Sequence, residues 1–202
     1  DLGDLPDTYG TLITSDGARH ISGTLILGAA FDSDPDGAPT PDATGDDTGD
    51  GSDDEDGIVR DPDDLWQAGN TVNITATVSG GEGTLAGWFD WNNDGDFEDT
   101  GESLEWYVFP GDNSLQVGVG DDYTTGTPLY ARFRLYPGEV VETSPTGLVS
   151  GGEVEDYRWR FGPNAVTLTS LWSRARALWV SGFLAVLAGF AVFGVVGTRR
   201  KR

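Results

Sequence analysis

Leu129–Tyr136 reads L-Y-A-R-F-R-L-Y, with an aliphatic, alanine or phenylalanine side chain at every second position. Successive side chains of a β-strand point to opposite faces, so this spacing predicts a strand with one buried face. Val154–Phe161 (V-E-D-Y-R-W-R-F) and Thr71–Val78 (T-V-N-I-T-A-T-V) repeat the pattern. The three segments predict a β-rich domain.

Shorter apolar runs extend this prediction along the chain. They are Ile21–Leu27, Thr84–Asp90, Ser103–Phe109 and Leu115–Val119. Turns rich in Gly, Pro and Asp separate the runs, and no helical periodicity appears before Leu171, a combination typical of antiparallel sheets. We therefore expect an all-β domain over residues 1–161, built as an antiparallel, jelly-roll-like β-sandwich.

The charge of this domain is strongly one-sided. All 34 acidic residues lie between Asp1 and Asp156 and face only four arginines there, which gives −30, whereas the whole chain carries −22. Such a charge repels phosphate backbones and anionic lipid surfaces, so we expect no nucleic-acid partner and favour cations as ligands. A solvating acidic coat on a salt-adapted surface is the alternative, and both can hold together.

Residue usage also argues against an enzyme. The chain has no cysteine and one histidine, His20, which disfavours zinc sites and a histidine-based triad and suggests a hydrogen-bonded structural role for His20. No nucleophile elbow, P-loop or zinc-binding helix is recognisable. A carboxylate acid/base pair and an aromatic carbohydrate platform at Trp88, Trp91, Trp106 and Tyr107 remain alternatives, although aromatic residues in strands are more often core.

Residues 90–102 read D-W-N-N-D-G-D-F-E-D-T-G-E, with oxygen-bearing side chains on alternate positions around a glycine. Calcium takes six to eight oxygen ligands, so this spacing predicts a calcium loop. The expected ligands are Asp90, Asn92, Asp94, Asp96 and Glu102. Position 12 of the loop is a glycine, and both flanks resemble strands, which argues against a helix-loop-helix hand. A metal-free Asn/Asp/Gly turn is the alternative.

Residues 178–196 contain no charge and would span about 28 Å as a helix, so we expect a transmembrane helix that contacts membrane lipid. The basic tail 197–202 then lies in the cytoplasm, and residues 162–177 form a juxtamembrane linker. The start at Asp1, without methionine, suggests a mature chain whose signal peptide was removed. A tail-anchored protein with a cytoplasmic domain is the alternative. Ser181, Ala185 and Gly189 form a small-residue stripe on which a partner helix could pack.

The segment 32–64 combines fourteen acidic residues with four prolines, and we expect a long, irregular surface loop. It should pack only at isolated apolar residues such as Ile58 and Val59. A further cation site is predicted at Asp54 and Asp56, together with neighbouring aspartates at positions 46, 47 and 53.

Gly152–Tyr157 spells G-E-V-E-D-Y, and with it the chain resembles the GEVED domain, a module of bacterial secreted and surface proteins. Further similar blocks are Asp1–Gly10, Gly17–His20, Gly45–Gly57, the loop at Asp90 and Leu129–Leu135. The resemblance implies an extracellular β-sandwich without established enzymatic activity. It identifies no ligand.

Within this motif, Glu153 and Glu155 lie on one strand face, where like charges repel. Arg132 and Arg134 on a neighbouring strand could offset them as an ion-pair ladder. Alternatively, Glu153 and Asp156 share a second calcium with Asp4 or Asp7. The sequence does not separate these two interpretations.

Together these features predict a non-enzymatic, calcium-stabilised extracytoplasmic module, anchored in a bacterial membrane by one helix and used for surface adhesion or architecture. The alternative is a single-span accessory subunit of a larger membrane complex, with its sandwich docked on the outer face of a partner protein.

Overall fold

The main sheet contains the strands with the clearest alternation. Its order is β10 (Glu153–Arg160), β8 (Pro128–Pro137), β5 (Gly83–Phe89) and β6 (Ser103–Val108), and all neighbours are antiparallel. The computed structural model describes residues 1–29, 35–45 and 55–161, all within a compact unit that spans Asp1–Gly162.

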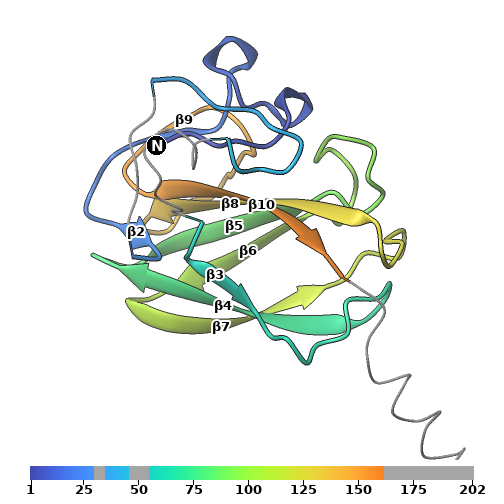
Figure 1. Ribbon diagram of the computed structural model, residues 1–202. Coiled ribbons are helices and arrows are strands. Elements are labelled where there is room, and N and C mark those ends of the chain that lie inside the picture. Colours follow the sequence, from blue (N-terminus) through green and yellow to red (C-terminus); the bar gives the residue numbers. More distant parts are fainter. Residues whose placement is uncertain (30–34, 46–54, 162–202) are drawn as a thin grey trace, which may run out of the picture. The chain divides into compact units, whose positions relative to one another are not determined.

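The second sheet is built around β4 (Thr71–Ser79). Along one edge β4 pairs with β2 (Ile26–Leu27) and β3 (Ile58–Arg60), and along the other with β7 (Gly111–Gly118). Figure 1 shows this sheet beneath the main sheet. Side chains from both sheets meet in one core, which includes Ile74 and Val117 from below and Phe89, Phe133 and Trp159 from above. The arrangement is sandwich-like.

The outer face of the main sheet is covered as well. The N-terminal segment, with 3₁₀ helices η1 (Asp7–Tyr9) and η2 (Ile13–Ser15), lies over it in Figure 1. A second apolar cluster forms there from Leu5, Tyr9, Ala43, Ala86, Trp88, Phe97 and Tyr136. Every residue of β5 is therefore buried, because alternate side chains enter different cores.

A two-stranded parallel sheet fastens this cover at its edge. It pairs β1 (Arg19–Ile21) with β9 (Leu148–Ser150), which connects the N-terminal segment to the loop before β10. Ile21–Leu27 is therefore not one strand, because β1 ends at Ile21 and β2 begins only at Ile26. The parallel pairing of β1 with β9 also departs from the expected antiparallel sandwich.

The all-β prediction is confirmed over the described residues. Ile58 is buried as expected, but the prediction for Val59 is wrong: its side chain is 56% exposed, since β3 alternates and only one face meets the core. Among the described residues, no helix has the length and apolar character needed to cross a membrane. The predicted span 178–196 with Ser181, Ala185 and Gly189, the linker 162–177, the tail 197–202 and Asp54 with positions 46, 47 and 53 lie outside the described residues.

Candidate functional site: a buried arginine network and the acidic loop

The pairing of β8 with β10 decides which side of the sheet each motif residue faces. Asp156 lies opposite Arg132, and Glu155 lies opposite Phe133. Residues directly opposite each other share a face, so Glu155 points into the core between the sheets, while Asp156 points toward the N-terminal cover. The G-E-V-E-D-Y sequence therefore places side chains on both faces of the main sheet.

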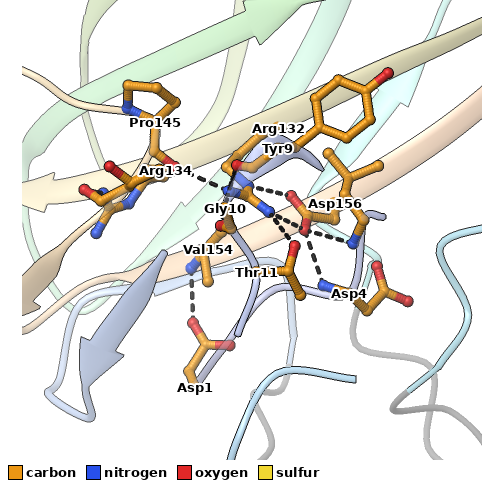
Figure 2. A network of polar contacts seen from close by, with 12 residues as sticks. Asp1, Asp4, Tyr9, Gly10, Thr11, Arg132, Arg134, Pro145, Val154 and Asp156 are labelled. Carbon is orange, nitrogen blue, oxygen red and sulfur yellow. Dashed lines mark hydrogen bonds and ion pairs between the residues drawn. The ribbon is translucent and has the colours of Figure 1, made fainter. Parts of the chain in front are cut away.

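Arg132 and Asp156 form a fully buried ion pair under the N-terminal segment (Figure 2). The guanidinium Nε and Nη2 donate to the two carboxylate oxygens, each at 2.7 Å. Arg132 also holds the covering segments, donating to the carbonyls of Tyr9 (2.9 Å), Gly10 (2.7 Å) and Pro145 (2.9 Å) and to Thr11 Oγ1 (3.1 Å). The pair therefore ties three parts of the chain together.

Asp156 also binds the start of the chain. Its Oδ2 accepts the backbone N–H of Asp4 at 2.8 Å and that of Leu5 at 3.0 Å. A methyl group on Gly3 would lie 2.2 Å from the same oxygen, so only glycine permits this approach. Asp4 thus meets Asp156 through its backbone, and its Oδ2 accepts the N–H of Gly45.

Arg134 is fully buried two positions further along β8, where it binds backbone carbonyls and a histidine. Its acceptors are Ser144 O, Thr146 O, Gly147 O, Arg19 O and His20 Nε2. The predicted ladder of Arg132 and Arg134 with Glu153 and Glu155 is therefore wrong, because both glutamates face the other core. Arg132 pairs with Asp156 instead, and Arg134 has no carboxylate among these acceptors. The difference arises because the loop that crosses Arg134 presents its carbonyl oxygens to the guanidinium.

His20 has the structural role that its isolation in the sequence suggested. Its Nδ1 lies 2.8 Å from Gly151 O, while Nε2 accepts from Arg134. Burial, and then the nearby Arg134 charge, lower the pKa of His20 to about 3. The ring is therefore neutral and carries its proton on Nδ1.

The two glutamates of the motif accept backbone hydrogen bonds in the other core. Glu153 Oε2 accepts the N–H of Leu27, and Glu155 Oε1 accepts that of Gly57 at 2.8 Å. Tyr157 Oη donates to Glu155 Oε2 at 3.0 Å. Burial raises the pKa of Glu155 well above its ordinary value. These carboxylates connect the second layer to β10.

Asp7 and Asp56 are the remaining described residues that were predicted as ligands of the second and third cation sites. Asp7 accepts the backbone N–H groups of Thr11 and Leu12 and the Ser15 hydroxyl, while Asp56 accepts the N–H of Ala29 at 2.8 Å. Asp7 thus closes a local turn, whereas Asp56 connects two segments that are 27 positions apart.

The acidic loop begins with a buried aspartate that organises its turn. Asp90 is 0% exposed, and its oxygens accept the N–H groups of Asp94 (3.1 Å) and Gly95 (3.0 Å). Gly95 has φ +98°, a conformation that favours glycine. At the far end Glu102, 2% exposed, accepts the N–H groups of Trp91 and Asp99. Burial raises the pKa of Glu102 to about 7.

Between these ends, polar side chains converge on one amide. Asn92 Nδ2 donates to Asp94 Oδ2 at 2.9 Å and to Asp99 Oδ2 at 2.7 Å. Asp96 instead accepts the N–H of Glu98. Asp99, which the spacing rule for the loop did not select, is therefore closer to this centre than Asp96. Its position ten residues into an acidic loop was the only available signal.

Across the described part of the chain, no set of three or more His, Cys, Asp or Glu side chains has a geometry that could hold a metal ion. Of the four residues of the predicted aromatic platform, Trp88 and Trp91 are core residues, 3% and 4% exposed, whereas Trp106 is partly buried and Tyr107 is 43% exposed. The Trp91 ring stacks on Phe89, with centroids 4.9 Å apart. A surface hollow of about 380 Å³ beside Trp91 is lined by Asn92, Asp99 and Glu102, among others.

Comparison with known proteins gives one family match. Residues 84–160 match the family model described as the GEVED domain. The matched stretch runs from the second residue of β5 to the end of β10, so the N-terminal cover and strands β2 to β4 lie outside it. No curated protein and no solved structure matched the chain.

Proposed function

We propose that the chain, whose residues 84–160 match the GEVED domain model, is a non-enzymatic, calcium-stabilised surface module with a jelly-roll-like sandwich. Residues 178–196 hold it in a bacterial membrane as a helix, with the acidic domain outside and the tail 197–202 in the cytoplasm. The module serves surface adhesion or surface architecture.

The observation that carries the calcium proposal is the contact of two carboxylates with one atom. Asp94 and Asp99 both accept from Asn92 Nδ2, so two like charges lie close together in the loop. A divalent cation at this place gains attraction from both carboxylates. A 180° flip of the Asn92 amide would place its oxygen there as a ligand of the kind that calcium prefers, in exchange for the hydrogen bond that Asp94 N–H donates to Asn92 Oδ1 at 3.0 Å.

The non-enzymatic part of the proposal is supported by how the motif residues are used. Asp156 accepts hydrogen bonds from the backbone of the N-terminal cover, and Glu153 and Glu155 accept them from the backbone of Leu27 and Gly57 on the side of the second sheet. Their carboxylates therefore connect layers of the fold. Calcium in the acidic loop would also stabilise the fold, because an ion that binds only to the folded state raises the free energy of unfolding.

Melting of the full chain in mild detergent tests the calcium proposal. We expect a higher melting temperature in about 1 mM calcium, the affinity range of extracellular calcium modules, and reversal by chelator. The double variant Asp94→Asn/Asp99→Asn should lose most of this shift. Asp63→Asn/Glu142→Gln, which removes the same charge from exposed positions, should retain it. An unchanged wild-type melting temperature on chelation would refute the proposal.

A further inference from the structure

Strand β6 is the outermost strand of the main sheet, and one of its edges has no neighbouring strand among the described residues. On its other side, Phe89 N–H donates to Glu102 O at the start of the pairing with β5. Hydrogen-bonded positions alternate along an antiparallel pair, so the backbone groups of Ser103, Glu105 and Tyr107 point away from β5. No hydrogen bond within the described part of the chain uses these groups. They form a template on which another strand can pair.

The core is incompletely covered along this edge. Leu104 and Trp106, which alternate with the outward-pointing positions, pack against the main core but are only partly buried. At the end of the strand, the exposed rings of Tyr107 and Phe109 lie against each other, with centroids 5.3 Å apart. Neighbouring strands share faces, so apolar side chains of an added strand would lie beside Leu104 and Trp106. Removing this apolar surface from water favours the addition of a strand.

The charge beside the edge indicates which kind of strand it accepts. Glu105 is exposed at the centre of β6. Partial burial, and then the nearby carboxylates of Glu82 and Glu139, raise the pKa of Tyr107. None of these three carboxylates belongs to an ion pair within the described residues. A second copy of this acidic domain would oppose Glu105 with like charge, which destabilises a sheet, whereas a basic segment is attracted.

We propose that β6 is a docking edge for an extended, basic segment of a partner protein, which adds a strand to the main sheet. Backbone hydrogen bonds to Ser103, Glu105 and Tyr107 supply affinity, and the alternation of side chains supplies specificity. Lysine or arginine residues of the segment lie opposite Glu105 on the outer face, and apolar residues lie beside Leu104 and Trp106 on the inner face. The inference goes beyond the proposed function, because it depends on neither calcium nor a membrane helix.

Fluorescence anisotropy with the full chain and a labelled peptide V-K-V-K-V-K-V tests this edge. The control peptide is N-methylated on its lysines, which keeps the charge but removes the N–H groups that would face β6. We expect its Kd to be at least about tenfold higher, because several backbone hydrogen bonds are lost. A peptide with glutamate in place of lysine should not bind. Equal Kd values for the two lysine peptides overturn the proposal, since general attraction to an acidic domain then explains binding, and so does a lysine peptide that fails to bind.

A proline in the strand locates the binding surface. Tyr107→Pro removes the outward N–H, and proline is tolerated on a sheet edge where that group faces solvent. Tyr107→Ala is the matched control, because it loses the same ring but keeps the N–H. The Kd of the lysine peptide should be about tenfold higher in Tyr107→Pro than in Tyr107→Ala. Equal values overturn the proposal, as does self-association of the wild type that Tyr107→Pro abolishes. If Tyr107→Pro does not fold, the two lysine peptides decide the question on the wild type alone.

Discussion

Arg132 and Asp156 face each other across β8 and β10 as an ion pair that is completely removed from solvent, with two hydrogen bonds of 2.7 Å. Isolated buried charges are costly, and a pair is tolerated only when its remaining donors and acceptors are satisfied. Here the covering segments supply the missing partners, namely carbonyls for Arg132 and N–H groups for Asp156 (Figure 2). The pair and its cover therefore depend on each other.

Asp156→Asn should destabilise the fold strongly. It leaves the Arg132 charge buried without a counter-ion, a change that costs about 3–5 kcal/mol in comparable pairs. Urea unfolding of the full chain measures the loss. Asp63→Asn, which removes an exposed carboxylate, should change stability by less than about 0.5 kcal/mol. A loss below about 1 kcal/mol in Asp156→Asn would show that the pair contributes little.

Arg134→Lys should also destabilise, despite the retained charge. The guanidinium of Arg134 reaches Ser144, Thr146 and Gly147 at once, and an ammonium group cannot reproduce that planar fork. Each buried carbonyl left without a donor costs about 1–3 kcal/mol, so we expect a loss of at least about 2 kcal/mol in urea unfolding. Arg160→Lys, at an exposed position of β10, is the control. Equal stability of both variants would contradict the role assigned to Arg134.

Stability should fall in acid because of His20. Its pKa is about 3 in the folded chain, below the ordinary 6.5, so between these values the unfolded chain binds a proton that the folded chain does not. The stabilisation is complete above about pH 6.5 and is lost as pH falls, by at most about 1.4 kcal/mol per pH unit. His20→Gln should show a shallower dependence of unfolding free energy on pH between 4 and 6.5.

Because His20 is the only histidine of the sequence, the difference between the two slopes reports this one group. The carboxylates contribute equally to both proteins. Identical slopes for wild type and His20→Gln would mean that the ring is protonated in the folded chain.

Gly152→Ala should prevent folding or cost more than about 3 kcal/mol. Gly152 has φ +77°, and a methyl group there would lie 1.7 Å from Leu135 O on the paired strand. Gly138→Ala separates the two causes, since Gly138 has φ +70° and nothing within 4 Å of the added carbon. It should cost only the backbone strain of about 1–2 kcal/mol. Circular dichroism and thermal melting compare the two variants, and similar losses would show that the contact is relieved by movement.

The alternation of residues along the chain was a dependable guide to the strands. Thr71–Val78 and Leu129–Tyr136 lie within β4 and β8, because period 2 follows directly from backbone geometry. Short strands were less visible. Ile58–Arg60 pairs with β4 although its surroundings are highly acidic, since the pairing depends on a neighbour that is distant in sequence.

The acidic loop was also readable in part. Its aspartates and glycine predicted the tight turn around Asp90, because Asx hydrogen bonds are local. The convergence of Asp94 and Asp99 on Asn92 was not predictable from spacing, and neither was the hydrogen bond that Tyr9 Oη donates to Asp90 Oδ2. Both depend on how the loop closes and on which segment covers it.

The sequence by itself determined that the domain is built from strands, that it carries a large negative charge and that glycine stands before the last strand. These follow from periodicity, composition and backbone sterics, which are local. Only the tertiary structure decided that Arg132 and Arg134 are buried and how Asp156 is used. A strand pattern shows two faces but not what covers each, and the segment that covers Arg132 includes Gly10 and Thr11, more than 120 positions away.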